Sequence, residues 1–177
     1  MLDLLGEHEA RATFFVLGRY AEERPQLVER TAREGHEVGN HTFDHVRAAD
    51  EEDAALRGQI ARTTAAARAA GAEIRLMRPP YGEDPERVAR LAREEGLSPT
   101  VMWSTHGFDW EEPPPERIAA DVLGGAEPGA IVLLHDGVPP GERRECGGMV
   151  DALGRILPAL RRDGYELVTV SELLAVR

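Results

Sequence analysis

Apolar residues in this chain fall either into short continuous runs or into longer segments with helical spacing. The run Ala-Thr-Phe-Phe-Val at residues 12–16 has the length and continuity of a strand that is buried on both faces. The run Ala-Ile-Val-Leu-Leu at 130–134 is the most strand-like of all. The expected strands cover residues 12–16, 37–39, 74–77, 100–103, 130–134 and 165–168.

The segments between these strands have helical spacing and recognisable ends. Pro25 and the pair Asp84-Pro85 suit the start of a helix, because proline needs no hydrogen-bond acceptor there and aspartate can cap the first turn. Glycines suit the ends of the helices that follow residues 50 and 85. The expected helices cover residues 25–34, 50–70, 85–96, 113–123, 149–162 and 171 onward, and residues 1–5 have the periodicity of a helix that has already begun.

Strands and helices therefore alternate about every 25–30 residues, which is typical of parallel β/α units. The chain has 177 residues, enough for one domain with one hydrophobic core. We expect a single α/β domain over residues 1–177, built as a barrel or barrel-like sheet of about six or seven parallel strands.

Charge and composition narrow the classes of partner. The formal net charge of −11 argues against nucleic acids and anionic membranes, because both bind clustered basic side chains. The one cysteine, Cys146, cannot form a disulfide within the chain. No apolar run reaches the roughly 18 residues of a transmembrane helix, and no signal-peptide pattern is visible. As it stands the sequence predicts a cytoplasmic protein; a signal peptide lost upstream would instead predict an extracytoplasmic one.

Two histidines follow the strand expected at 37–39. His41 and His45 are four residues apart, and in helical geometry this spacing places both imidazoles on one face. Two such rings can share a zinc ion at roughly 2.0–2.1 Å per nitrogen. Asn40 precedes them, where its side chain could cap the turn and hold the backbone of His41. Taken alone, the pair could equally be two surface histidines.

Further polar residues stand at the ends of other expected strands. They form the stretches Arg-Pro-Pro-Tyr-Gly at 78–82, Phe-Asp-Trp at 108–110 and Leu-Leu-His-Asp at 133–136. In a repeating β/α chain the carboxyl ends of the strands meet at one rim, where binding sites are built. We therefore expect these stretches to contribute to one site.

Taken together and in this order, the stretches resemble the motifs of the polysaccharide deacetylases, carbohydrate esterase family 4. The resemblance covers essentially the whole chain. It is carried by residues 12–18, 35–45, 78–82, 109–110 and 133–135. It implies a distorted (β/α) barrel that removes acetyl groups from N-acetylated sugars, such as those of peptidoglycan or chitin, or from O-acetylated xylan.

The resemblance also implies one divalent metal ion, with His41 and His45 among its ligands. Zinc is the metal expected, with cobalt and nickel as alternatives, because a site of histidine and carboxylate accepts all three. A metal can polarise the carbonyl of an amide, which is otherwise a poor electrophile.

In the same comparison His135 is the general acid that protonates the leaving amine. Asp109 holds and tunes that histidine, and Arg78 lies beside the catalytic base. Histidine suits proton donation because its reference pKa of about 6.5 is near neutrality. Outside the family, the alternatives are a surface ion pair for Arg78 and a hydrogen-bonded core histidine for His135.

The resemblance assigns the remaining pocket residues as well. The backbone N–H of Tyr81 helps to bind the oxyanion, and Trp110 and Leu133 wall the acetyl pocket. A donor aimed at a developing oxyanion contributes on the order of 3 kcal/mol. In most proteins a tryptophan and a leucine at such positions would simply be core residues.

The chain departs from the family pattern in two places. The family's first motif, Thr-Phe-Asp-Asp-Gly, supplies the catalytic base and the third metal ligand, and no residue of this chain matches it; Asp3 and Asp44 stand elsewhere. His106 occupies a position that is usually aspartate. One explanation is that the protein begins further upstream. The other is a degenerate relative, which would be a non-catalytic sugar-binding domain or a metal-free barrel with structural histidines.

A missing first strand would have a structural consequence. The strand at residues 12–16 would then have an unpaired edge, and such edges pair with other chains. A homodimer through this edge is therefore a further expectation.

Overall fold

The computed structural model describes residues 1–143 and 146–176. The chain divides into two compact units. One comprises Thr13–Met102, and the other combines Met1–Ala12 with Trp103–Arg177. Each unit is described by itself.

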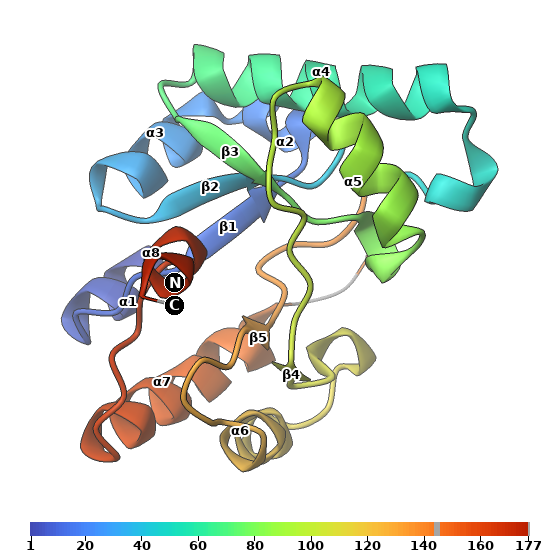
Figure 1. The fold of residues 1–177 in the computed structure, drawn as a ribbon. Helices are drawn as coiled ribbons and strands as arrows, with labels where there is room; N and C mark the ends of the chain where they lie inside the picture. The colour runs from blue at the N-terminus through green and yellow to red at the C-terminus, as the bar shows by residue number, and fades with distance from the viewer. Residues whose placement is uncertain (144–145, 177) are drawn as a thin grey trace. The chain divides into compact units, whose positions relative to one another are not determined.

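The unit Thr13–Met102 is built on a three-stranded parallel sheet with the order β1-β2-β3. Its strands are β1 (Thr13–Val16), β2 (Glu37–Asn40) and β3 (Ile74–Met77) (Figure 1). Phe15 of β1 lies opposite Gly39 of β2. The register between β2 and β3 shifts between Val38 and Asn40. β1 is an outer strand of this sheet, and a dimer through its edge stays a prediction.

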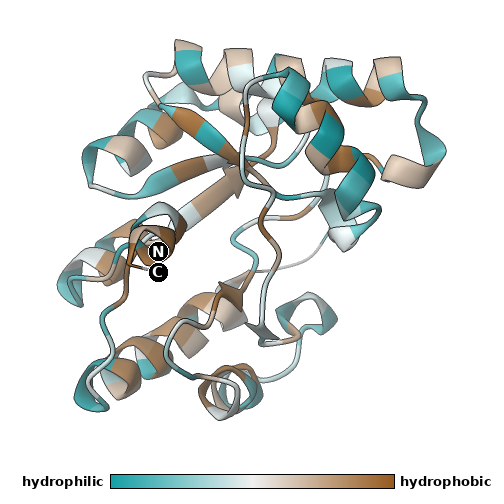
Figure 2. Ribbon diagram, viewed as in Figure 1, coloured by the Kyte–Doolittle hydropathy of each residue, from teal (hydrophilic) through white to brown (hydrophobic). Residues whose placement is uncertain are grey.

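Four α-helices and two short 3-10 turns complete this unit, and the last of each kind follows β3. Their bounds are α2 (Gly18–Glu23), α3 (Pro25–Arg33), η1 (Ala48–Asp50), α4 (Asp53–Ala69), η2 (Pro80–Gly82) and α5 (Pro85–Glu94). In Figure 2 hydrophobic and hydrophilic residues alternate along α4 and α5, as expected for helices with one face against a core. The most buried side chains of this core are Leu56, Ile60, Ile74, Met77, Val88 and Leu97.

The prolines begin α3 and α5 as predicted, with Pro25 and Pro85 in the first turn. Asp84 stands at the predicted N-cap position, but its side chain makes no cap hydrogen bond. Its φ of 44° is left-handed, whereas a capping aspartate normally has extended backbone. The helix start was predicted correctly and the capping contact was not.

The second unit contains a two-stranded parallel sheet of β4 (Thr105–His106) and β5 (Val132–Leu133). Its helices are α1 (Leu2–Glu7), η3 (Asp109–Glu111), α6 (Pro115–Gly124), α7 (Gly147–Arg162) and α8 (Val170–Ala175). Its core lies between α6 and α7 and includes Ile118, Val122, Ala152, Ile156 and Leu160.

The first and last segments of this unit are bound together. Thr169 and Glu172 form a reciprocal capping box at the start of α8. Glu172 also pairs with Arg11 at 2.9 Å, and the Arg11 N–H donates to the carbonyl of Leu167.

The prediction of an α/β chain with parallel strands is confirmed, whereas a barrel of six or seven strands is not. The described residues contain five strands, divided between two sheets. The strand predicted at 100–103 is reduced to one bridge between Met77 and Thr100, and only Val132–Leu133 of the run 130–134 pair.

The strand predicted at 165–168 is wrong. Leu167 packs against the α6–α7 core, but the segment is not a strand. Its apolar side chains are partly buried but its backbone forms no strand, because hydrophobicity reports what a side chain packs against and not what its backbone pairs with.

None of the helices in the described parts of the chain is long and apolar enough to cross a membrane.

The close approach of the Phe15 ring to Gly39 of β2 can be tested by substitution. A Cβ atom there would lie 2.5 Å from Cδ1 of Phe15, so Gly39→Ala must displace the ring. We expect a loss of about 1–3 kcal/mol in the free energy of unfolding, the usual cost of overpacking. Gly58→Ala in α4 is the control, because nothing lies within 4 Å of its Cβ position. That change should stabilise by about 0.5–1 kcal/mol. Equal midpoints in urea for both variants would contradict the packing.

Candidate active site

The two histidines of the predicted metal pair lie close together, although they do not lie on a helix. The segment after β2 is a loop in which Thr42 and His45 have left-handed φ values of 65° and 60°. This fold brings the ring centroids of His41 and His45 to 4.9 Å, at 67° to one another. The predicted proximity is therefore present, but a tight loop replaces the predicted helical face.

Asn40 anchors this loop to α4. Its side chain is fully buried, and its amide nitrogen donates to the carbonyl of Ile60 at 2.8 Å and to Oγ1 of Thr64 at 3.0 Å. Its Oδ1 accepts the N–H of Thr42 at 2.9 Å. Asn40 thus holds the turn as predicted, but the N–H that it binds belongs to Thr42. The N–H of His41, which it was expected to hold, donates instead to the carbonyl of Val16 at 3.0 Å.

Gln59 of α4 provides a second anchor that the sequence did not reveal. Its Oε1 accepts the N–H groups of Phe43 at 2.9 Å and Asp44 at 2.8 Å. A glutamine in a polar, alanine-rich helix has no local signal that distinguishes it from a surface residue. Its role depends on the loop that packs against it.

The tautomer of His41 is fixed by the loop at 78–82. Nδ1 of His41 lies 2.6 Å from the carbonyl oxygen of Arg78. Because a carbonyl only accepts hydrogen bonds, Nδ1 carries the proton and the lone pair lies on Nε2. A metal-binding histidine typically has this arrangement, with the second ring nitrogen donating to an oxygen.

The donor set fits a metal only in part. Among the described residues, no third histidine, cysteine, aspartate or glutamate joins the pair to form a metal-binding group. A catalytic zinc normally has three protein ligands, and the pair of His41 and His45 offers two nitrogen donors.

Asp44 lies between His41 and His45 in the sequence, but its carboxylate contacts other residues. Its carboxylate accepts from Nε of Arg19 at 2.8 Å and from Nε2 of Gln59 at 3.1 Å. Burial opposes the charge, but the hydrogen bonds from Gln59 and Arg19 outweigh it and hold the pKa of Asp44 below its usual value. Asp44 is therefore a structural anion of this loop.

Arg78 is buried, so its interpretation as a surface ion-pair partner is wrong. Its side chain donates to the carbonyls of Val101 at 3.2 Å and Met102 at 3.1 Å, and its guanidinium carbon lies 4.2 Å from the ring centroid of Phe15. Burial lowers the pKa of Arg78 to about 10. Because two carbonyls and one aromatic ring hold it, the Arg78 guanidinium is a fixed positive charge beside the loop of His41.

Tyr81 lies in η2 with a left-handed φ of 58°. Its ring centroid is 4.6 Å from that of His45 and 4.0 Å from the guanidinium carbon of Arg47. The structure thus brings Tyr81 to the histidine pair. Arg47 was not predicted, because an arginine in a loop gives no sign of the ring it will cover.

In the other unit, Asp109 and His135 form a tightly held pair. Asp109 opens η3 after β4, and its side chain is only 2% exposed. One carboxylate oxygen accepts the backbone N–H of His135 at 2.7 Å, and the other lies 3.0 Å from Nδ1 of the same histidine. Asp109 therefore fixes both the backbone and the ring of His135, with the proton of the neutral ring on Nδ1.

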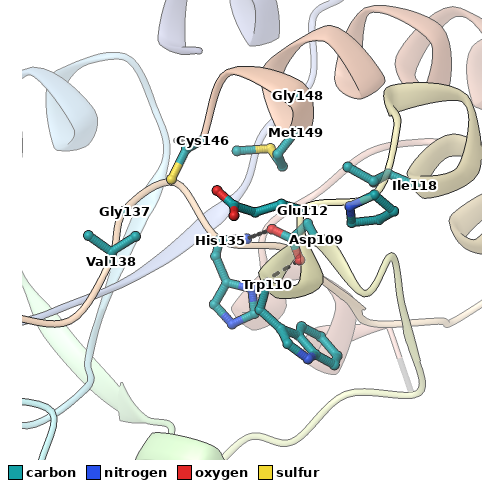
Figure 3. A pocket seen from close by; sticks show the side chains of 11 residues that line it. Asp109, Trp110, Glu112, Ile118, His135, Gly137, Val138, Cys146, Gly148 and Met149 are labelled. Carbon is teal, nitrogen blue, oxygen red and sulfur yellow. Dashed lines mark hydrogen bonds and ion pairs between the residues drawn. The ribbon is translucent and has the colours of Figure 1, made fainter. Parts of the chain in front are cut away.

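A pocket of about 220 Å³ adjoins this pair (Figure 3). Trp110 lines it, and its ring meets that of His135 edge to face, with the centroids 5.6 Å apart. Leu133, the other predicted pocket wall, is buried and is not among the residues that line this pocket. The lining also includes three side chains that the sequence did not suggest, namely Glu112, Cys146 and Met149.

His106, the residue at which the sequence departs from the expected motif, packs with aromatic residues. Its ring centroid is 4.1 Å from that of Phe108 and 5.3 Å from that of Trp110. Within the described residues its Nδ1 is buried without a hydrogen-bond partner. His106 therefore supports Trp110 through ring contacts.

The predicted residues thus fall into two groups, each within one unit. His41, His45 and Tyr81 lie together, with the carbonyl of Arg78 bound to His41. Asp109, His135 and Trp110 form the second group.

Comparisons with known proteins identify the family of this chain. The family model described as polysaccharide deacetylase matches residues 1–100. A chitooligosaccharide deacetylase from Bradyrhizobium sp. (strain ANU 289) is 40% identical over 181 residues, covering 98% of this chain and 82% of the relative. A peptidoglycan-N-acetylglucosamine deacetylase from Bacillus cereus is 42% identical over 176 residues, covering 98% and 80%.

A solved structure is similar as well. It is a carbohydrate esterase family 4 pseudoenzyme from Bacillus anthracis, with a TM-score of 0.87 and 29% identity. The match covers 98% of this chain and 58% of the pseudoenzyme's chain. With a family model that matches more than half of its residues and relatives at 40% identity along nearly its whole length, this chain belongs to the polysaccharide deacetylase family.

Proposed function

We propose that this protein is a metal-dependent deacetylase that hydrolyses the N-acetyl amide of a glycan, such as peptidoglycan or a chitin oligosaccharide. The single observation that carries the proposal is the pair Asp109–His135, with both carboxylate oxygens engaged by one histidine. The names of the two relatives, a chitooligosaccharide and a peptidoglycan deacetylase, support the substrate class.

The proposed chemistry gives His135 the role of general acid. An amide nitrogen is a poor leaving group until it receives a proton. Asp109 keeps the ring in one orientation by accepting from its Nδ1–H. Trp110 packs against the same ring and excludes water from one side of it. The N–H of Tyr81 is the proposed oxyanion donor.

His41 and His45 are the proposed ligands of one divalent ion, with zinc the first candidate and cobalt and nickel the alternatives. When bound, such an ion supplies Lewis-acid polarisation of the amide carbonyl. The hydrogen bond from His41 to the Arg78 carbonyl supports this role, because it leaves the Nε2 lone pair for coordination.

A second candidate function is a non-catalytic sugar-binding domain of the same fold. Two observations favour it: the similarity to a pseudoenzyme, and the two-histidine donor set among the described residues. Two imidazoles without a carboxylate would hold a metal ion weakly.

Acetate release separates the two candidates. Purified protein is incubated with N-acetylated chitooligosaccharide or peptidoglycan fragments, with added zinc, and free acetate is measured. A deacetylase releases acetate and stops when a chelator is added. A sugar-binding domain binds the same fragments in calorimetry, with or without chelator, and releases none.

The substitution Asp109→Asn tests the proton donor. It keeps the shape of the side chain but removes the acceptor that fixes Nδ1–H, so acetate release should fall by about 10²–10⁴-fold. Asp121→Asn is the matched control, because Asp121 pairs with Arg117 at 2.7 Å on the surface of α6. Its rate should stay near that of the wild type. Similar losses in both variants would remove Asp109 from the mechanism.

Metal affinity tests the histidine pair without using activity. Zinc affinity is measured by competition with a chromogenic chelator. Loss of an outer-shell partner typically weakens metal binding about 10–100-fold, and His41→Ala should weaken it by more than that. His8→Ala controls for the number of histidines, because His8 lies at the end of α1. Unchanged affinity in His41→Ala would contradict the assignment.

A further inference from the structure

Two residues outside the predicted site join the histidine loop to the loop of Tyr81. Arg47 lies two residues after His45, and Glu83 lies two residues after Tyr81. The Arg47 guanidinium covers the Tyr81 ring with its carbon 4.0 Å from the centroid, and its Nη1 forms an ion pair with Glu83. One side chain from the first loop thus makes two different contacts with the second.

The backbone at both loops needs such support. Tyr81 and His45 have φ values of 58° and 60°, a conformation that L-residues with large side chains rarely adopt. Residues in this region persist only where the surrounding structure holds them. The Tyr81 ring contacts both the ring of His45 and the guanidinium of Arg47, and each of these contacts opposes relaxation of the turn.

The chemistry of the guanidinium explains why both contacts come from arginine. Its planar group can lie flat on an aromatic ring while an N–H at its edge donates to a carboxylate. A lysine ammonium could keep the charge pair, but it has no flat face to stack on the ring. The combination of a stacked ring and an edge-on carboxylate therefore depends on arginine specifically.

We propose that Arg47 and Glu83 are positioning residues, which clamp the Tyr81 turn against the histidine loop. The catalytic consequence rests on the proposed function, in which Tyr81 offers its N–H and His45 binds the metal. A donor that drifts from the oxyanion position loses much of its effect, because this stabilisation depends on preorganised geometry. The clamp fixes the turn that carries that donor.

The test measures the two loops directly, by hydrogen exchange of peptides that cover residues 41–47 and 78–84. In Arg47→Ala, exchange in both peptides should accelerate by about tenfold, the combined effect of an exposed cation–π contact and a surface ion pair. Arg47→Lys should give a smaller acceleration, as should Glu83→Gln, since each removes one of the two contacts. Exchange in peptides from α7 serves as the internal reference.

Arg57→Ala is the matched control. Arg57 forms exposed ion pairs with Glu94 at 3.3 Å and Glu95 at 3.7 Å on the surface of α4 and α5. Its loss removes the same charge and should leave exchange at 41–47 and 78–84 unchanged. Acceleration in Arg57→Ala equal to that in Arg47→Ala would overturn the clamp, as would exchange within twofold of the wild type in Arg47→Ala.

Kinetics give a second readout. Where acetate is released, Arg47→Ala should lower kcat about tenfold while KM changes little, and Arg47→Lys should recover part of the loss. Loss confined to KM would overturn the positioning role. If the protein releases no acetate, the proposed function is contradicted but the clamp is not. The exchange experiment then still decides whether Arg47 and Glu83 hold the two loops together.

Discussion

The buried side chain of Asn40 is the contact on which the histidine loop depends. It binds α4 through its amide nitrogen and the loop through its oxygen, so it joins the end of β2 and the turn of Thr42 to that helix. Gly39, next to it, leaves room for the Phe15 ring that lies beneath Arg78. The strand, the loop and the buried arginine are therefore parts of one packed arrangement, and the histidine pair is held at its edge.

The two histidines with resolved Nδ1 contacts show how one side chain can serve different chemistry. His41 donates to a neutral carbonyl, which fixes the tautomer without adding charge, as suits a metal ligand. His135 faces a buried carboxylate that also accepts its backbone N–H. The Nδ1 atoms of the two histidines therefore contact different kinds of oxygen, and neither oxygen adjoins its histidine in the sequence.

This chain belongs to the polysaccharide deacetylase family, and some of its contacts involve residues outside the motifs that resemble the family. The ring of His106 packs with those of Phe108 and Trp110. Arg47 and Glu83 join two loops that the family motifs describe separately.

The sequence alone determined the order of β/α elements, most helix starts, the family and the identity of nearly every candidate residue. These features are local: proline fixes a first turn, an apolar run marks burial, and a motif is a short string. Only the tertiary structure decided that His41 and His45 meet in a left-handed loop, that Arg78 is buried, and that residues 165–168 do not form a strand. Backbone pairing, burial of a charge and contact between loops all depend on residues far apart in the chain, and no local pattern encodes which distant partner a group will find.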